Sequence, residues 1–469
     1  MNGLHAYSGQ LKRSLKNRHI QLIALGGAVG TGLFLGSAGA LKFAGPSMIL
    51  GYAICGFIAF MIMRQLGEMI VEEPVAGSFS HFAHKYWGGF AGFLSGWNCW
   101  MLYTLVGMSE LTAVGKYVHY WWPEIPIWVS AAVFFVLINA LNLINVKVFG
   151  EAEFWFAIIK VLAVIGMIAM GSYLLVSGNG GPQASVSNLW QHGGFFPHGI
   201  GGLAMSMAII MLSFGGLEML GFTAAEAQQP RSVIPKAINQ VIYRILIFYI
   251  GVLVVLLSLM PWDSLLTSLN ASGDTYSGSP FVRVWSMLDS NTAAHILNFV
   301  VLTAALSVYN SGTYCNSRIL LGLAQQGDAP QSLVKIDKRG VPVRSILATA
   351  AVTLIAVVMN YVIPQHALEV LLSLVVATLV INWAMISLAH GKFRQHLNQT
   401  RQTPRFKALW YPYGNYVCLA FMVFIMAVML MDPVNRMAVY AIPIWIALVW
   451  VCHSIKHRRR ASQSLYGKA

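Results

Sequence analysis

The stretch GGAVGTG at residues 26–32 interrupts an apolar segment long enough to cross a membrane, and SFGGLE at residues 213–218 interrupts another. Backbone that leaves the helix inside a bilayer is tolerated only where it lines a cavity or is sealed by other helices, because lipid offers it no hydrogen bonds. The freed amides and carbonyls then become ligand groups, as in the broken helices of transporters. The two interruptions therefore predict a transporter with its binding site at the breaks.

The composition indicates a membrane protein with many spans. Of the 469 residues, 57% are hydrophobic and only 10% are charged, and the mean hydropathy is +0.64, which excludes an ordinary soluble globule. Apolar stretches of about 20 residues, enough for one crossing, recur along the chain. The twelve predicted spans are 20–43, 47–71, 90–118, 126–146, 154–177, 200–224, 238–260, 291–324, 344–363, 367–390, 409–431 and 437–455.

The order of these spans is duplicated. Spans one to five and spans six to ten each open with a glycine-broken segment, and an odd number of spans per block inverts the second block in the membrane. Such inverted repeats hold their substrate at the interface between them, near the bilayer midplane. The predicted segments are a cytoplasmic N-terminus at 1–19, a first repeat at 20–199, a second repeat at 200–390, two further spans within 391–455, and a cytoplasmic C-terminus at 456–469.

The formal net charge of +14 gives an orientation here rather than a nucleic-acid partner. Lys and Arg cluster in alternate loops, notably 335–344 and 392–407, and at both chain ends. The positive-inside rule therefore predicts that both termini are cytoplasmic, which requires an even number of spans. The five cysteines lie within or at the ends of predicted spans and have no metal-binding spacing, so neither a disulfide nor a metal site is expected.

The first break is predicted to bind an anion. Glycines allow successive N–H groups around Gly30, Thr31 and Gly32 to converge on one point where the helix resumes, and the Thr31 hydroxyl adds a donor. Free carbonyls near Ala28, Leu212 and Gly215 suit an ammonium group, so the pair of poles fits a zwitterionic α-amino acid. Alternatively, the glycines only allow close helix packing; two dense breaks that open two repeats favour binding.

Several long stretches carry a family resemblance. They are LKNRHIQLIALGGAVGTGLFLGSA, RQLGEMIVEEPVAGSFSHFAHKYWG, FGEAEFWFAIIKVLAVIGMI, SFGGLEMLGFTAAEAQQPRSVIPKA, LSVYNSGTYCNSR and KRGVP. By these stretches the chain resembles the amino acid permeases of the APC superfamily, and most closely the bacterial aromatic amino acid permeases. The resemblance implies the leucine-transporter fold, proton-coupled uptake across a bacterial inner membrane, and backbone contacts from the substrate's α-carboxylate and α-amino groups to Ala28, Thr31, Gly32, Leu212 and Gly215.

Buried charges are the candidates for proton coupling. Lys160 interrupts an apolar span, where a central lysine costs about 2.5–3.5 kcal/mol on insertion scales. In transporters of the resembled fold, an ammonium here replaces a sodium ion; the alternative is a permanently charged lysine that bridges carbonyls. Glu110 and Glu218 are the other deep carboxylates, with either coupling or structural roles. Near the cytoplasmic face, gate salt bridges with nearby Arg and Lys are predicted for Glu68, Glu72, Glu73 and Glu226.

The pocket for the substrate side chain is predicted to be apolar and aromatic. Tyr103 and Gly107 on the third span and Phe214 in the second break are its candidates, with the Phe214 ring as a lid. The expected substrates are phenylalanine, tyrosine and tryptophan, with histidine or large aliphatic amino acids as the alternative. A channel would need a continuous polar pore lining, but the spans are apolar apart from isolated charges. An intramembrane enzyme would need a cluster of catalytic residues such as Ser and His or paired Asp, so neither class is favoured. We expect protons and membrane lipid as partners, no nucleic acid, no cofactor, and a monomer or weak dimer.

Overall fold

The computed structural model is helical and contains no β-strand in the part of the chain that it describes. The described residues are 30–75, 78–144, 146–223, 229–271, 276, 278–288 and 290–466. The predicted all-α class is confirmed.

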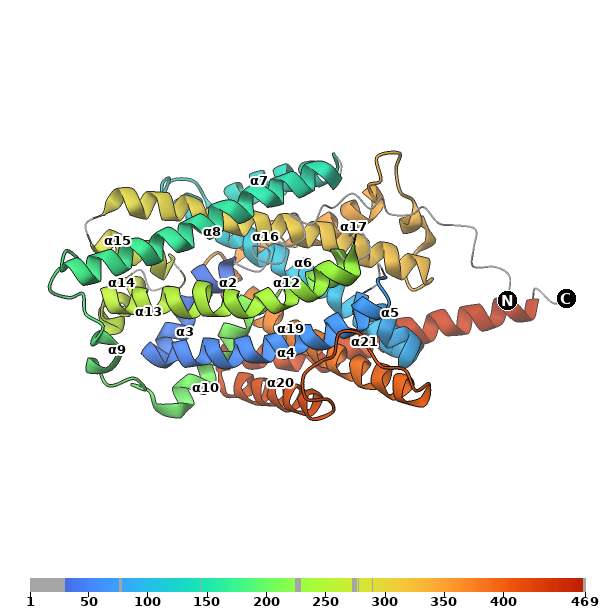
Figure 1. Ribbon diagram of the computed structural model, residues 1–469. Helices are drawn as coiled ribbons and strands as arrows, with labels where there is room; N and C mark the ends of the chain where they lie inside the picture. The colour runs from blue at the N-terminus through green and yellow to red at the C-terminus, as the bar shows by residue number, and fades with distance from the viewer. Residues whose placement is uncertain are drawn as a thin grey trace.

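Most of the described chain lies in helices that run along one long axis (Figure 1). The α-helices are α2 (Thr31–Phe34), α3 (Gly36–Ala44), α4 (Met48–Glu72), α5 (Ser78–Tyr86), α6 (Gly89–His119), α7 (Ile127–Asn142), α8 (Val146–Ser177), α9 (Asn188–Gln191), α10 (Gly199–Ile210), α11 (Met219–Thr223), α12 (Pro230–Arg244), α13 (Val252–Leu259), α14 (Trp262–Asn270), α15 (Pro280–Met287), α16 (Asn291–Gln325), α17 (Val343–Thr353), α18 (Ile355–Val362), α19 (Ala367–Gln399), α20 (Tyr413–Met431) and α21 (Pro433–Tyr466). The 3₁₀ segments are η1 (Gly45–Ser47), η2 (Met211–Phe214) and η5 (Gln331–Val334), and η4 (Ile245–Gly251) is a π segment.

Nine helices of the described residues are long and apolar enough to cross a membrane. One of them, Thr31–Glu72, has 42 residues, or about 63 Å at 1.5 Å per residue, twice the roughly 30 Å apolar core of a bilayer. The chain turns inside it at Gly45, whose φ of 54° is left-handed, and this run overlaps two of the predicted spans, 20–43 and 47–71. Each of the twelve predicted ranges overlaps a described helix; twelve crossings and the five-plus-five repeat remain predictions.

The centre of the molecule consists of α6, α16 and α19, three long helices of which α6 packs against both others. The most exposed apolar side chains lie instead on outer helices, for example Leu162 on α8, Val423 on α20 and Ile444 on α21. An extensive apolar outer surface marks a face that is covered by something other than water. Membrane lipid is the cover that the apolar composition of these helices predicts.

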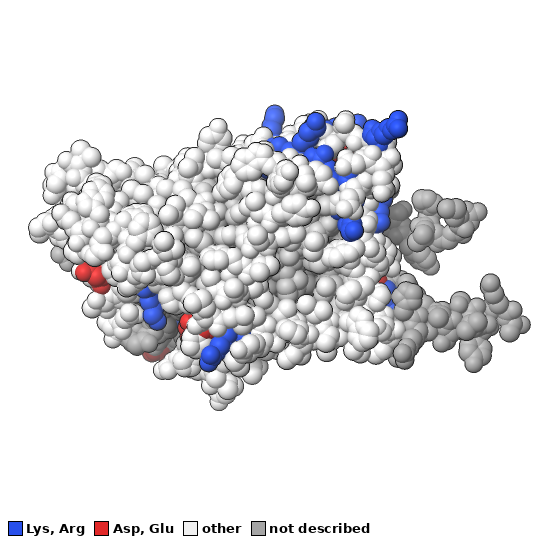
Figure 2. Space-filling view, turned by 90° about the horizontal axis from the view of Figure 1, so that it is seen from below, with Lys and Arg blue, Asp and Glu red and all other residues white. Residues whose placement is uncertain are grey.

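On the face seen in Figure 2, the exposed charged side chains lie toward the two ends of the molecule. Figure 2 shows most Lys and Arg of the visible face at one end, a few charges of both signs at the other, and an uncharged band between them. The richer end is the one where α5 and α17 lie (Figure 1). This distribution is the one expected for helices that cross an apolar layer, because charged groups stay in water on either side.

Candidate functional site

The described part of the first predicted break begins at Gly30 and leads into a short helix, α2. Gly30 has φ of −142° and ψ of −149°, which is not helical, and its carbonyl accepts the N–H groups of Leu33 and Phe34. Helix α2 then lasts only to Phe34 before the chain resumes as α3 at Gly36. The preceding part of the motif, including the predicted contact residue Ala28, lies outside the described residues.

The second predicted break is present as a longer interruption. Helix α10 ends at Ile210, η2 follows, and Gly215 is extended with φ of −59° and ψ of 142°. Gly216 then takes φ of 94°, a left-handed conformation that favours glycine. The α-helix resumes only at Met219, so the backbone between these helices lacks the regular hydrogen bonds of an α-helix.

The two breaks touch each other directly. A Cβ atom built on Gly32 would lie 2.8 Å from the carbonyl carbon and oxygen of Leu212 and 2.8 Å from the Ser213 nitrogen. Such contacts are with backbone, which cannot move away as a side chain can. Glycine at position 32 is therefore what allows the first break to lie against the second.

A small cavity of about 30 Å³ lies at this junction. It is lined by Gly30, Thr31, Gly32, Leu102, Tyr103, Val106, Ser109, Glu110, Leu212, Gly215, Gly216, Met219, Val308, Leu372 and Val375. The cavity is close to the size of one water molecule, so the site is closed around a space too small for an amino acid. It nevertheless brings together seven predicted residues: Gly30, Thr31, Gly32, Tyr103, Glu110, Leu212 and Gly215.

Two predicted pocket residues lie beside the cavity rather than on its wall. A Cβ atom on Gly107 would lie 3.0 Å from the Tyr309 ring, so glycine at this position allows α16 to pack closely against α6. The Phe214 ring packs against Tyr249, with centroids 4.8 Å apart, and against Tyr52, at 6.1 Å. A lid role for Phe214 therefore requires its ring to leave this aromatic cluster, and it stays a prediction.

The Glu110 carboxylate accepts hydrogen bonds from Thr31, whose N–H and hydroxyl groups are the donors predicted from the sequence to bind an anion. The Thr31 N–H donates to Glu110 Oε1 at 3.3 Å, and the Thr31 hydroxyl donates to Oε2. Both side chains are buried, with 4% of Glu110 and 2% of Thr31 exposed. The Thr31 donors thus contact a carboxylate of the protein itself, and their contact with the carboxylate of a substrate stays a prediction.

Lys160 belongs to a buried polar network that includes an unforeseen carboxylate, Glu153. Lys160 Nζ donates to Ser307 Oγ at 2.9 Å, and Ser307 donates to Glu153 at 2.7 Å. Asn310 also donates to Glu153 at 2.7 Å and accepts a hydrogen bond from Asn142. The network joins α7, α8 and α16.

The spacing of Glu153 and Lys160 in the sequence is enough to predict that the two side chains are neighbours. Glu153 and Lys160 are seven residues apart, nearly two helical turns, so they share one face of α8. A carboxylate on the same face is the simplest compensation for a buried ammonium. Both side chains are almost fully buried.

Glu218 is not part of the cavity wall and lies among buried polar side chains. Its carboxylate lies near the Tyr103 hydroxyl and the Trp383 indole N–H, and neither carboxylate oxygen makes a hydrogen bond of normal geometry to the described residues. Tyr103 also lines the cavity. Glu218 therefore lies beside a residue of the cavity wall, Tyr103.

A wider vestibule of about 500 Å³ adjoins the cavity and shares Leu212 and Leu372 with it. Its charged and titratable lining residues are Lys42, Tyr276, His366, Glu369 and Asp432. Since Lys42 precedes α4 and Glu68 lies in the last turns of α4, the vestibule and Glu68 are at opposite ends of the molecule. The vestibule is thus a polar approach to the site from one end only.

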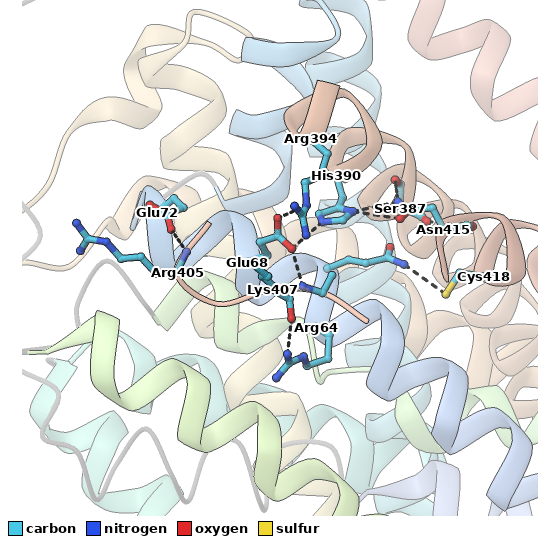
Figure 3. Close-up of polar contacts among 12 residues, drawn as sticks. Arg64, Glu68, Glu72, Ser387, His390, Arg394, Arg405, Lys407, Asn415 and Cys418 are labelled. Carbon is cyan, nitrogen blue, oxygen red and sulfur yellow. Dashed lines mark hydrogen bonds and ion pairs between the residues drawn. The ribbon is translucent and has the colours of Figure 1, made fainter. Parts of the chain in front are cut away.

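The opposite end is fastened by a buried cluster around Glu68 (Figure 3). Arg394 Nε lies 2.5 Å from Glu68, His390 Nε2 lies 3.3 Å from it, and the Ala408 N–H donates to it at 2.6 Å. His390 also contacts Asn415. The cluster ties α4 to α19 and to the segment before α20, as the predicted gate salt bridge of Glu68 requires.

The neighbouring predicted gate carboxylates also have partners. Glu72 accepts the backbone N–H of Arg405 at 2.7 Å, a hydrogen bond rather than the predicted salt bridge. Glu73 pairs with Lys85 at 2.7 Å, as predicted. Burial raises the pKa of the Glu73 carboxyl, but hydrogen bonds from Lys85 and Tyr86 outweigh it and hold that pKa below its ordinary value. Glu226 lies outside the described residues.

Metal-binding arrangements are absent from the described ranges, where no three His, Cys, Asp or Glu side chains gather as ligands.

Known proteins similar to this chain include amino acid transport proteins and a permease. "Aromatic amino acid transport protein AroP" of Escherichia coli (strain K12) is 65% identical over 449 residues, 96% of each chain. The protein of the same name from Salmonella typhimurium (strain LT2) is 64% identical over the same share. "Uncharacterized amino acid permease YtnA" of Bacillus subtilis is 42% identical over 97% of each chain. The amino acid permease family matches residues 19–465, and the chain belongs to that family.

Proposed function

We propose that this chain is a proton-coupled transporter that imports phenylalanine, tyrosine and tryptophan across a bacterial inner membrane by alternating access. The names of the relatives at 64–65% identity support the substrate class. The proposal includes twelve spans in a five-plus-five inverted repeat, with both termini in the cytoplasm. The transporter is proposed to act as a monomer or weak dimer and without a cofactor. Nine apolar helices in the described part of the chain, and the position of the surface charges toward the two ends in Figure 2, support the membrane topology.

The observation that carries the proposal is the meeting of two broken helices around one closed cavity. Its polar groups are the Thr31 amide and hydroxyl and the backbone of Leu212 and Gly215, which suit the carboxylate and ammonium of an amino acid. The remaining wall is apolar apart from Tyr103, Ser109 and Glu110. An aromatic side chain fits such a wall, because it gains burial and ring contacts there.

Alternating access has a structural counterpart at each end. The vestibule reaches Leu212 and Leu372, which separate it from the cavity. At the other end the Glu68 cluster holds α4, α19 and the segment before α20 together. We infer that substrate passes Leu212 and Leu372 from outside and leaves after the Glu68 cluster opens.

The first expected result concerns uptake by cells that express this chain. Labelled phenylalanine, tyrosine and tryptophan should compete with one another, and a protonophore should abolish their accumulation. One charge that moves through 100 mV supplies about 2.3 kcal/mol, or roughly fifty-fold accumulation. Uptake that requires sodium and survives the protonophore would contradict proton coupling.

The runner-up is a permease of the same fold for histidine or large aliphatic amino acids. Its distinguishing measurement is a binding assay with purified protein over all twenty amino acids. A preference for histidine or leucine over phenylalanine would replace the aromatic assignment and leave the transport mechanism in place.

Tyr103 should set the preference for aromatic side chains. Tyr103→Leu keeps an apolar wall but removes the ring, so phenylalanine and tryptophan should lose up to about tenfold in affinity relative to leucine, from a ring contact of about 0.5–1.5 kcal/mol. Phe214→Leu is the comparison, since Phe214 packs on Tyr52 and Tyr249 here. An equal change for all substrates in Tyr103→Leu would reject the role. A selective aromatic loss in Phe214→Leu would identify Phe214 as the lid.

A further inference from the structure

The predicted carboxylate-binding point is already filled by a carboxylate of the protein. Glu110 reaches from α6 to the first break and accepts hydrogen bonds from both the amide and the hydroxyl of Thr31. These are the donors that an amino acid substrate would use. Glu110 and Thr31 line the same cavity as Gly30 and Leu212.

There is no room at Thr31 for a second carboxylate beside Glu110. A Cβ on Gly30 would already lie 3.1 Å from Glu110 Oε1 and 2.6 Å from Val308 Cγ2. Two carboxylates at one pair of donors would also repel each other strongly away from water. A substrate therefore reaches Thr31 only when Glu110 withdraws.

The surroundings of Glu110 decide what happens to it on withdrawal. Among the described residues, Tyr117 on its own helix and Lys160 on α8 face it, and Tyr103, also on α6, lines the same cavity. The Tyr117 hydroxyl is buried and makes no hydrogen bond of normal geometry to the described residues. The cavity residues from η2, α11, α16 and α19 carry no titratable group; those side chains are Leu212, Met219, Val308, Leu372 and Val375. A carboxylate turned toward such a wall is stable only when it is neutral.

Resting on the proposed function, we propose that Glu110 is a tethered stand-in for the substrate's carboxylate, and that substrate binding displaces it and makes it take up one proton. The substrate carboxylate replaces the Glu110 carboxylate at the Thr31 amide and hydroxyl. Glu110 binds one proton from the outer solution and becomes a neutral carboxylic acid. When the substrate leaves on the cytoplasmic side, Glu110 loses that proton there and returns to Thr31, so one proton and one positive charge cross with each zwitterion.

Lys160 then transmits the change to other helices. Its ammonium faces both Glu110 and Glu153, and once Glu110 is neutral, Glu153 is the carboxylate that still attracts it. Since Ser307 on α16 bridges Lys160 and Glu153, the contact between α8 and α16 responds to the state of Glu110.

The test is isothermal titration calorimetry of phenylalanine into the purified full chain, in buffers of different ionisation enthalpy and over a pH series. Wild type should take up about one proton for each phenylalanine bound. In the pH range where Glu110 is charged before binding, its affinity for phenylalanine should fall about tenfold for each unit by which the pH rises. Glu110→Gln should bind phenylalanine without proton uptake and with an affinity that does not depend on pH. Lys160→Gln and Glu218→Gln should keep the proton uptake.

A second measurement covers the case in which Glu110→Gln does not fold. Infrared difference spectra of wild type should show a new protonated-carboxyl stretch when phenylalanine binds, and Glu110→Asp should shift its frequency. Phenylalanine binding by wild type without proton uptake, or without that infrared band, overturns the proposal. Proton uptake that persists in Glu110→Gln also overturns it, as does proton uptake that disappears in Lys160→Gln or Glu218→Gln. A wild type that does not bind phenylalanine contradicts the proposed substrate class instead.

Discussion

Gly32→Ala is expected to reduce phenylalanine binding severely while the protein still inserts and folds. The new methyl group would lie 2.8 Å from the backbone of Leu212 and Ser213, so the two breaks would have to separate. Overpacking of this kind costs about 1–3 kcal/mol, and each 1.4 kcal/mol is tenfold in affinity. Gly32→Val should abolish binding, because its branches also block the approach to the Thr31 amide.

The matched control for this prediction is Gly36→Ala. Gly36 lies four residues further along, and a Cβ there would meet its nearest neighbour, the Thr31 carbonyl oxygen, at 3.7 Å, an ordinary contact. Binding by Gly36→Ala should therefore equal that of wild type in a thermal-shift assay with phenylalanine. Normal binding by Gly32→Ala would show that the break serves only helix packing.

Lys160→Gln is expected to lose proton-driven accumulation while exchange of labelled for unlabelled substrate partly survives. The ammonium is the charge that links Glu110 to the α8 and α16 contact through Ser307. Its removal leaves substrate binding intact but disconnects protonation from the rearrangement of helices. The measurement is the accumulation ratio in proteoliposomes with an imposed proton gradient, beside counterflow without one. Proton-driven accumulation equal to that of wild type would reject a coupling role for Lys160.

The Glu153 contact supplies the control for folding. Lys160→Gln alone leaves Glu153 buried without its counter-charge, and removal of one partner of a buried pair costs about 3–5 kcal/mol. Lys160→Gln with Glu153→Gln removes both charges and should recover most of the thermal stability without recovering accumulation. Recovery of both would mean that Lys160 acts only on stability.

Local sequence features predicted the helices and the breaks well. Apolar runs fix where helices form because membrane-crossing segments must satisfy their own backbone hydrogen bonds. The interruption at 213–218 and the non-helical Gly30 appear where glycine clusters allow them. The partner of Glu68 was predicted only by class, since the sequence does not reveal which basic residue of a distant helix approaches it; the structure identifies Arg394, with His390 beside it.

What the sequence alone determined is therefore the all-helical membrane class, the two breaks and the deep charged residues, all of which depend on residue types within one segment. Only the tertiary structure decided which of those residues meet. The contact between Glu110 and Thr31 joins residues 79 positions apart, and the bridge from Lys160 through Ser307 to Glu153 spans α8 and α16. Phe214 packs outside the cavity for the same reason. The direction of a side chain at a helix break depends on how distant helices pack around it, and no local pattern encodes that packing.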